Sequence, residues 1–153
     1  MFWYHWFMKI SIYTDGGARG NPGISGYGVV VLDENNNIIY KESKFLGIKT
    51  NNEAEYMALV AALTWLNENW SKLNIDYVDF CSDSQLMVRQ MQGLYKVKAG
   101  NLIGLHNSAK NLLISISCPV KFKDIRREFN KLADELANQA MDQKWSIKKL
   151  NYL

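Results

Sequence analysis

Cysteines and long apolar runs are what this chain most clearly lacks, and each absence excludes a class of protein. The two cysteines, Cys81 and Cys118, lie far apart and form no CxxC pair, which excludes a disulfide scaffold and argues against a zinc site. A reducing compartment, and hence a cytoplasmic location, is the expectation. No apolar run is long enough to cross a bilayer, so we expect no membrane partner.

The chain also contains no internal repeat, low-complexity tract or linker, so its 153 residues predict a single domain. Apolar residues make up 48% and charged residues 22%, which is typical of a soluble globular protein. We assign residues 9–145 to this domain and 146–153 to a C-terminal tail. Residues 1–8 form an extension without an assigned function, because their aromatic run is too short for a membrane helix and lacks the features of a secretory signal.

Positive charge is concentrated in the second half of the chain. Between residues 94 and 131 there are eight Lys and Arg residues but only two acidic ones. A basic surface in that half would suit a phosphate backbone. From charge alone, however, an ordinary solvated face is the simpler interpretation.

The hydrophobic pattern predicts an α/β fold. Three strands joined by short connections should form an antiparallel meander, whereas strands joined through helices should pair in parallel. The result is a mixed five-stranded sheet flanked by helices, with residues 15–28 as a Gly-rich turn region. The expected strands are 9–14, 27–32, 38–45, 77–82 and 119–125, and the expected helices are 50–69, 84–92, 102–113 and 130–144.

Four acidic residues stand where a carboxylate serves folding poorly. Asp15 and Asp83 end strands that can be neighbours, and the ends of adjacent parallel strands are where sites form. Glu55 begins the apolar stripe of the first long helix and should point inward, where an unpaired charge is costly. Asp134 lies within the last helix, with Ala137 on its face.

Taken singly, most of these acids have ordinary explanations. Asp15 could be a turn residue before Gly-Gly, Asp83 a helix N-cap, and Asp134 a first-turn acid favoured by the helix dipole. Glu53 is left out of the site because it completes a capping box with Thr50. If the four converge, their mutual repulsion needs a cation, and oxygen ligands alone favour Mg²⁺ or Mn²⁺ over zinc.

Four sequence blocks, in this order and on these expected elements, resemble type 1 ribonuclease H over nearly the whole chain. They are TDGGARGNPG from Thr14, TNNEAE from Thr50, SDSQ from Ser82 and NKLADELA from Asn130. The resemblance implies an endonuclease that cuts the RNA strand of an RNA–DNA hybrid and leaves 5′-phosphate and 3′-hydroxyl ends. It also implies two Mg²⁺ or Mn²⁺ ions held by Asp15, Glu55, Asp83 and Asp134.

The same resemblance implies the substrate contacts. By the family's pattern, the loop after the first aspartate and the Asn pair before the helix read the minor groove of the hybrid, and a second group of residues grips a phosphate of the DNA strand. Gly16, Asn21, Asn52 and Gln85 match the first set, and Thr50, Asn51 and Asn101 match the second.

Two departures from the family mark this chain as a short form. The stretch from Gly93 to Asn101 is too short for the basic protrusion of some relatives, and Lys96 and Lys98 are weak substitutes for it. The loop before Asp134 has no histidine, so Arg127 is the candidate for its role, with Glu128 beside the metals. His106 is interpreted as structural.

Other functions stay open at this point. A catalytically dead hybrid-binding module would not need clustered negative charge facing a polyanion. An exonuclease or transposase core of the same superfamily orders its acids differently. Double-stranded RNA is a further possible substrate, the domain could derive from a mobile element, and no obligate protein partner is evident.

Overall fold

The fold is taken from a computed structural model that describes residues 7–150. One six-stranded sheet has the order β5-β4-β1-β2-β3-β6. Its strands are β1 (Met8–Arg19), β2 (Gly23–Leu32), β3 (Ile38–Lys49), β4 (Ile75–Ser82), β5 (Val120–Asp124) and β6 (Ile147–Leu150). The helices are α1 (Asn51–Asn69), α2 (Gln85–Met91), α3 (Gly100–Ile114), the short 3₁₀ helix η1 (Arg127–Phe129) and α4 (Lys131–Gln143).

The strand pairing confirms the predicted α/β class and mixed sheet. β1, β2 and β3 form an antiparallel meander, and β4 and β5 run parallel to β1. The sixth strand was not predicted: β6 lies in the expected C-terminal tail and pairs antiparallel with β3. Phe45 N donates to Ser146 Oγ just before β6 begins, so the chain is already fixed against β3 there. A four-residue strand carries too short an alternation to be recognised from sequence.

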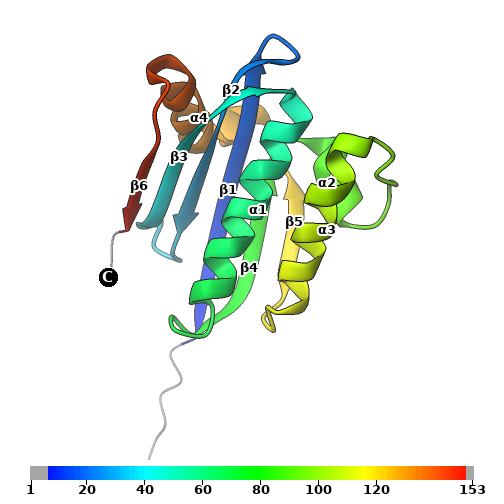
Figure 1. Cartoon of the computed structure of the whole chain (residues 1–153). Helices are drawn as coiled ribbons and strands as arrows, with labels where there is room; N and C mark the ends of the chain where they lie inside the picture. The colour runs from blue at the N-terminus through cyan, green and yellow to red at the C-terminus, as the bar shows by residue number, and fades with distance from the viewer. Residues whose placement is uncertain (1–6, 151–153) are drawn as a thin grey trace, which may run out of the picture.

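Helices cover both faces of the sheet (Figure 1). On one face α1 packs across β1 and β2, and the apolar stripe predicted from Leu59, Ala62 and Leu66 is fully buried there. On the other face α4 lies across β1, β2 and β3. This two-sided packing places a helix on each side of the carboxyl end of β1.

The predicted Gly-rich turn region is the main error in the element assignment. β1 continues to Arg19 and β2 starts at Gly23, so the turn itself is confined to residues 20–22. Glycine occupies these strand positions because a helix packs so closely against the strand that no side chain fits. A Cβ on Gly28 would overlap the backbone of α4 at Ala133, and a Cβ on Gly16 would overlap the backbone of α1.

The helix starts are partly as predicted. Thr50 and Glu53 form the capping box of α1, with both hydrogen bonds present. Ser84, not Asp83, caps α2 by accepting from Met87 N. Asn130 precedes α4 but does not cap it with its side chain, because its backbone is not extended there; its Nδ2 instead donates to Thr14 O at 2.9 Å.

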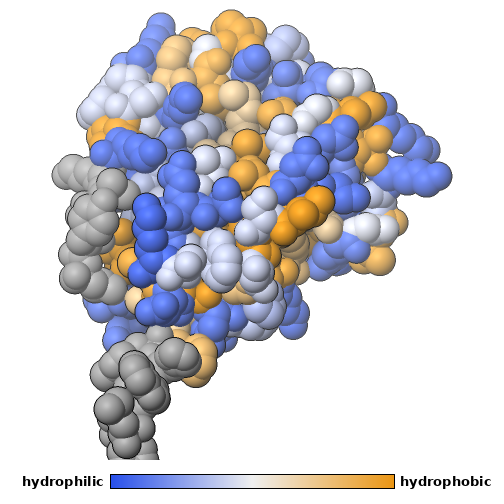
Figure 2. All heavy atoms as spheres, turned by 60° about the horizontal axis from the view of Figure 1, so that its bottom comes forward, coloured by the Kyte–Doolittle hydropathy of each residue, from blue (hydrophilic) through white to orange (hydrophobic). Residues whose placement is uncertain are grey.

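The described helices were also compared with what a membrane span requires. Among residues 7–150, no helix combines the length and apolarity that crossing a bilayer requires. Figure 2 turns the end of the sheet where β1 begins toward the viewer, and hydrophilic and apolar side chains are intermingled on that face.

Candidate active site

Two aspartates meet where the parallel ladder between β1 and β4 ends. The last paired residues are Thr14 and Ser82, so Asp15 and Asp83 each follow directly at the same edge. β1 itself runs on past Asp15, paired only with β2. Asp15 is only 7% exposed. The register of this one strand pair therefore brings together two acids that are 68 positions apart.

A third carboxylate enters from α1 across a glycine. Gly16 has no side chain, and α1 lies against the backbone at that point. Glu55, 8% exposed, thus reaches the space beside Asp15, and the Gly16 backbone N–H donates to its carboxylate. Ligand oxygens of Asp15, Glu55 and Asp83 all lie within 4.8 Å of one another. The inward orientation predicted for Glu55 is confirmed.

Burial and mutual repulsion raise the pKa values of the three clustered carboxylates. Burial, reinforced by Asp83 and Asp134, raises the pKa of Asp15 to about 8. Burial first, and then Asp15 and Asp83, raise the pKa of Glu55 well above its ordinary value. The pKa of Asp83 is raised mainly by burial, while hydrogen bonding from Asn130 and the charge of Arg127 oppose that rise. The charged forms of these carboxylates are therefore unfavourable without a counter-charge.

The donor set fits a hard divalent cation. Glu55 Oε2 and Asp83 Oδ2 are buried and have no hydrogen-bond partner, which is costly unless something else binds them. All three candidate ligands are carboxylates, and oxygen ligands favour Mg²⁺ or Mn²⁺. The cluster supports a divalent metal site without specifying the ion.

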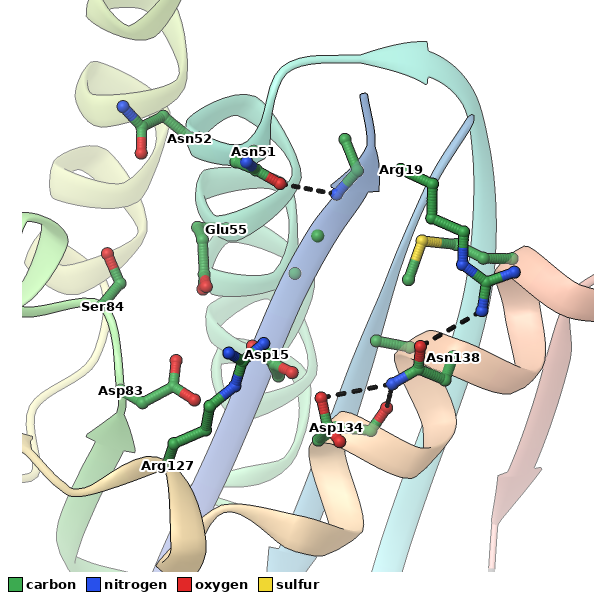
Figure 3. Close-up of a pocket in the computed structure, with 15 residues that line it drawn as sticks. Asp15, Arg19, Asn51, Asn52, Glu55, Asp83, Ser84, Arg127, Asp134 and Asn138 are labelled. Atoms are coloured by element: carbon green, nitrogen blue, oxygen red, sulfur yellow. Dashed lines mark hydrogen bonds between the residues drawn. The ribbon is translucent and has the colours of Figure 1, made fainter. Parts of the chain in front are cut away.

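Asp134 lies on α4 at the opposite wall of the same cavity, outside the group of three (Figure 3). After burial and the charge of Asp83, Asp134 is the next cause that raises the pKa of Asp15. The cavity has a volume of about 400 Å³ and is partly open to solvent. Asp134 thus acts electrostatically on the cluster, as the fourth acid of the predicted set.

Four of the predicted substrate residues line this cavity, namely Gly16, Asn51, Asn52 and Arg127. Asn21 and Thr50 lie next to it, since Asn21 Oδ1 accepts from Asn51 N at 3.1 Å and Thr50 caps the helix that begins there.

Two other predicted substrate residues are not brought to the cavity. Gln85 is exposed at the start of α2, and Asn101 hydrogen-bonds Glu53 from the start of α3. Glu128, expected beside the metals, pairs with Arg126 outside the cavity. His106 packs edge-on against the Tyr56 ring, in keeping with a structural role.

Sequence reasoning missed several residues that line the cavity, above all Arg19 and Asn138. Asn138 follows Asp134 by four positions, so the two side chains share one face of a helix. That spacing was the available signal. For Arg19 none existed, because its role depends on how far β1 extends.

Comparison with known proteins agrees with this architecture. The family model described as "Reverse transcriptase-like" matches residues 13–140. The solved structure of LC11 ribonuclease H1 in complex with an RNA/DNA hybrid is 45% identical, with a TM-score of 0.83, over 88% of this chain and 98% of that one. The solved ribonuclease H1 of Halobacterium salinarum is 32% identical, with a TM-score of 0.78, over 88% of this chain and 98% of that one.

A longer protein is also similar. The chain is 40% identical over 136 residues to a bifunctional protein of Mycobacterium tuberculosis, covering 88% of this chain and 36% of that protein. The chain therefore spans about a third of the length of this curated relative.

Proposed function

This chain belongs to the type 1 ribonuclease H family, and we propose that it is an endonuclease that hydrolyses the RNA strand of RNA–DNA hybrids, leaving 5′-phosphate and 3′-hydroxyl ends. The proposal is supported by a relative of similar length, LC11 ribonuclease H1, whose structure was solved with an RNA/DNA hybrid. The observation that carries it is local to this chain. Three carboxylates with elevated pKa values, two of them buried and the third, Asp83, half-buried, face one open cavity.

We assign Asp15, Glu55, Asp83 and Asp134 as ligands of two Mg²⁺ or Mn²⁺ ions. Such a pair, when bound, activates a water and stabilises the leaving oxygen of a phosphodiester. The chain itself supplies the ligands from four places in the fold: Asp15 lies in β1, Glu55 in α1 and Asp134 in α4, and Asp83 directly follows β4. Cation binding would offset the burial and the repulsion that raise the pKa values of Asp15 and Glu55.

The substrate would lie across the cavity mouth. Asn51 links the two blocks that the family uses for the hybrid, because its N–H donates to Asn21 and its Oδ1 accepts from Ala18 N at 2.7 Å. The turn after β1 and the start of α1 are therefore held as one surface. We assign contacts to the RNA or bases to Gly16, Asn21, Asn52 and Gln85, and contacts to a DNA-strand phosphate to Thr50, Asn51 and Asn101.

We propose that Arg127 guides the phosphate backbone of the nucleic-acid substrate toward the carboxylates. It lines the cavity, and its charge lowers the pKa of both Asp15 and Asp83. A guanidinium at the edge of an acidic cluster attracts a phosphate that the carboxylates alone would repel. We assign to it the role that a loop histidine fills in other members of the family.

The domain is assigned to residues 9–145, with residues 146–153 as a C-terminal segment that contributes β6 to the sheet edge. Both cysteines are buried and free, which accords with the reducing, cytoplasmic compartment predicted from the sequence.

The decisive experiment compares end-labelled hybrid, duplex RNA and duplex DNA, each with Mg²⁺, Mn²⁺ or a chelator, and adds a circular hybrid to separate endonuclease from exonuclease. We expect cleavage of the hybrid's RNA strand, linear or circular, only when metal is present. Asp15→Asn should abolish cleavage while Glu135→Gln, an exposed acid on α4, should not. Hybrid retained without cleavage in either metal, or wild-type rates in Asp15→Asn, would contradict the proposal.

A further inference from the structure

A chain of hydrogen bonds runs along one face of α4 and ends at Asp134. Asp134, Asn138 and Asp142 are four positions apart, so their side chains lie in a row on the helix. Asn138 Nδ2 donates to Asp134 Oδ1 at 3.2 Å and to the Asp134 backbone oxygen at 3.0 Å. Arg19, at the end of β1, donates to Asn138 Oδ1 at 3.2 Å (Figure 3). Arg19 also forms an ion pair with Asp142.

Arg19 determines which way the Asn138 amide faces. An asparagine side chain has one end that donates and one that accepts, and the two ends are nearly identical in shape. A guanidinium only donates, so the oxygen of Asn138 must face Arg19. The amide nitrogen is thereby turned toward Asp134. The ion pair with Asp142 keeps Arg19 in place for this contact.

The amide restrains an acid that is only partly enclosed by the protein. Asp134 is only half-buried, and it faces Asp15 and Asp83, whose pKa values it raises. Repulsion from those carboxylates favours rotation of the Asp134 side chain toward solvent. A donor fixed to Oδ1 opposes that rotation and leaves the other oxygen free for a cation.

We propose that Asn138 is a positioning residue that holds Asp134 ready to bind a cation, and that Arg19 acts through Asn138 by fixing its amide. The inference rests on the proposed function, since it takes Asp134 as a metal ligand. It concerns groups that touch a ligand residue rather than the ion itself. Such outer partners commonly change metal affinity by an order of magnitude.

The test measures Mn²⁺ binding to the free protein by calorimetry and by the electron paramagnetic resonance signal of unbound Mn²⁺, without substrate. Asn138→Ala should weaken binding about tenfold. Asn138→Asp should weaken it further at neutral pH, because an acceptor replaces the donor. Gln139→Ala, an exposed neighbour on α4, is the matched control and should bind as wild type does.

A double-mutant cycle then tests whether Arg19 acts through Asn138. Arg19→Ala should weaken Mn²⁺ binding about threefold alone and have no further effect in the Asn138→Ala background, because the interaction it supports is already gone. Additive effects would instead assign Arg19 a separate role and overturn this part. Thermal unfolding without metal is the control for general destabilisation. A variant that is only destabilised would have a lower melting temperature but would bind Mn²⁺ as wild type does at temperatures where it is folded.

The outcomes separate this inference from the proposed function. If wild type binds Mn²⁺ and Asp15→Asn does not, but Asn138→Ala binds like wild type, the positioning role is wrong and the metal site stands. If wild type binds no Mn²⁺, both proposals fail. Weakened binding in Asn138→Ala, with hybrid cleavage restored by higher Mn²⁺, supports both.

Discussion

Replacing Gly16 by alanine adds one methyl group between β1 and α1, and we expect it to disrupt the arrangement of the clustered carboxylates. The added Cβ would lie 2.5 Å from Glu55 N and closer still to the carbonyl carbon and oxygen of Ala54. These are backbone atoms of α1, so no side-chain rotation can relieve the overlap. Ordinary van der Waals contact begins at 3.4 Å, so α1 and β1 must move apart by about 1 Å.

That displacement has two measurable consequences. Overpacking of this kind costs up to about 3 kcal/mol of the free energy of unfolding, which in a domain of this size lowers the melting temperature by roughly 6–12 °C. Because Glu55 is carried by the displaced segment, its carboxylate moves relative to Asp15. A misplacement of about 1 Å at a catalytic group can lower activity about 100-fold.

The neighbouring glycine provides the control. A Cβ on Gly17 would meet only Met141 Cε, at an ordinary contact distance of 3.8 Å. Gly17→Ala should therefore be neutral or stabilise by up to about 1 kcal/mol, since alanine restricts the unfolded chain more than glycine does. The assay is thermal unfolding with and without Mg²⁺, and kcat/KM on hybrid, for both variants.

The reasoning depends on the difference between two adjacent positions. If Gly16→Ala unfolds at the same temperature as Gly17→Ala and cleaves hybrid equally well, α1 does not lie against β1 as described. A loss of activity in Gly16→Ala with unchanged stability would assign the effect to substrate contact instead of helix displacement.

Three further predictions concern charge and capping. Because the pKa of Asp15 is raised to about 8 and that of Glu55 is also raised, folded protein without metal retains protons that the unfolded chain loses near pH 4. Its free energy of unfolding should thus fall as pH rises from about 4 to about 8, measured by urea titration with chelator, and Asp15→Asn should flatten that slope; an equal slope in both would contradict the assignment. Thr50→Ala removes the capping box of α1 and should cost about 1 kcal/mol in the same titration, whereas no loss would show that the cap is redundant. Neutralising Lys96 and Lys98, both exposed, should weaken hybrid binding and reduce its dependence on salt, and an unchanged salt slope would show that neither touches phosphate.

The sequence was informative wherever a short-range pattern carried the physics. The apolar stripe that follows Glu55 predicted an inward carboxylate, and the glutamate is buried. The Thr50 and Glu53 pair predicted a capping box, and both hydrogen bonds are present. Helix periodicity and local hydrogen bonds depend on residues within one or two turns, so one sequence suffices to recognise them.

The errors arose where a long-range contact overrides a local preference. Glycines near Asp15 usually indicate a turn, but here Gly16 and Gly28 are strand residues that let helices approach. Asparagine is a common N-cap residue, but the side-chain amide of Asn130 instead donates a hydrogen bond to Thr14 O. Each of these depends on an element more than 35 residues away in the sequence.

By itself, the sequence indicated the side chains that we propose as metal ligands: four acids, at the ends of strands and on inward helix faces, whose charge makes sense only together. Tertiary structure alone decided how they are held. It set the close approach of α1 at Gly16, the link from Arg19 through Asn138 to Asp134, and the added strand β6. The physical reason is that residue type fixes what a group can bind, whereas the distance between two groups is set by the packing of the elements that carry them.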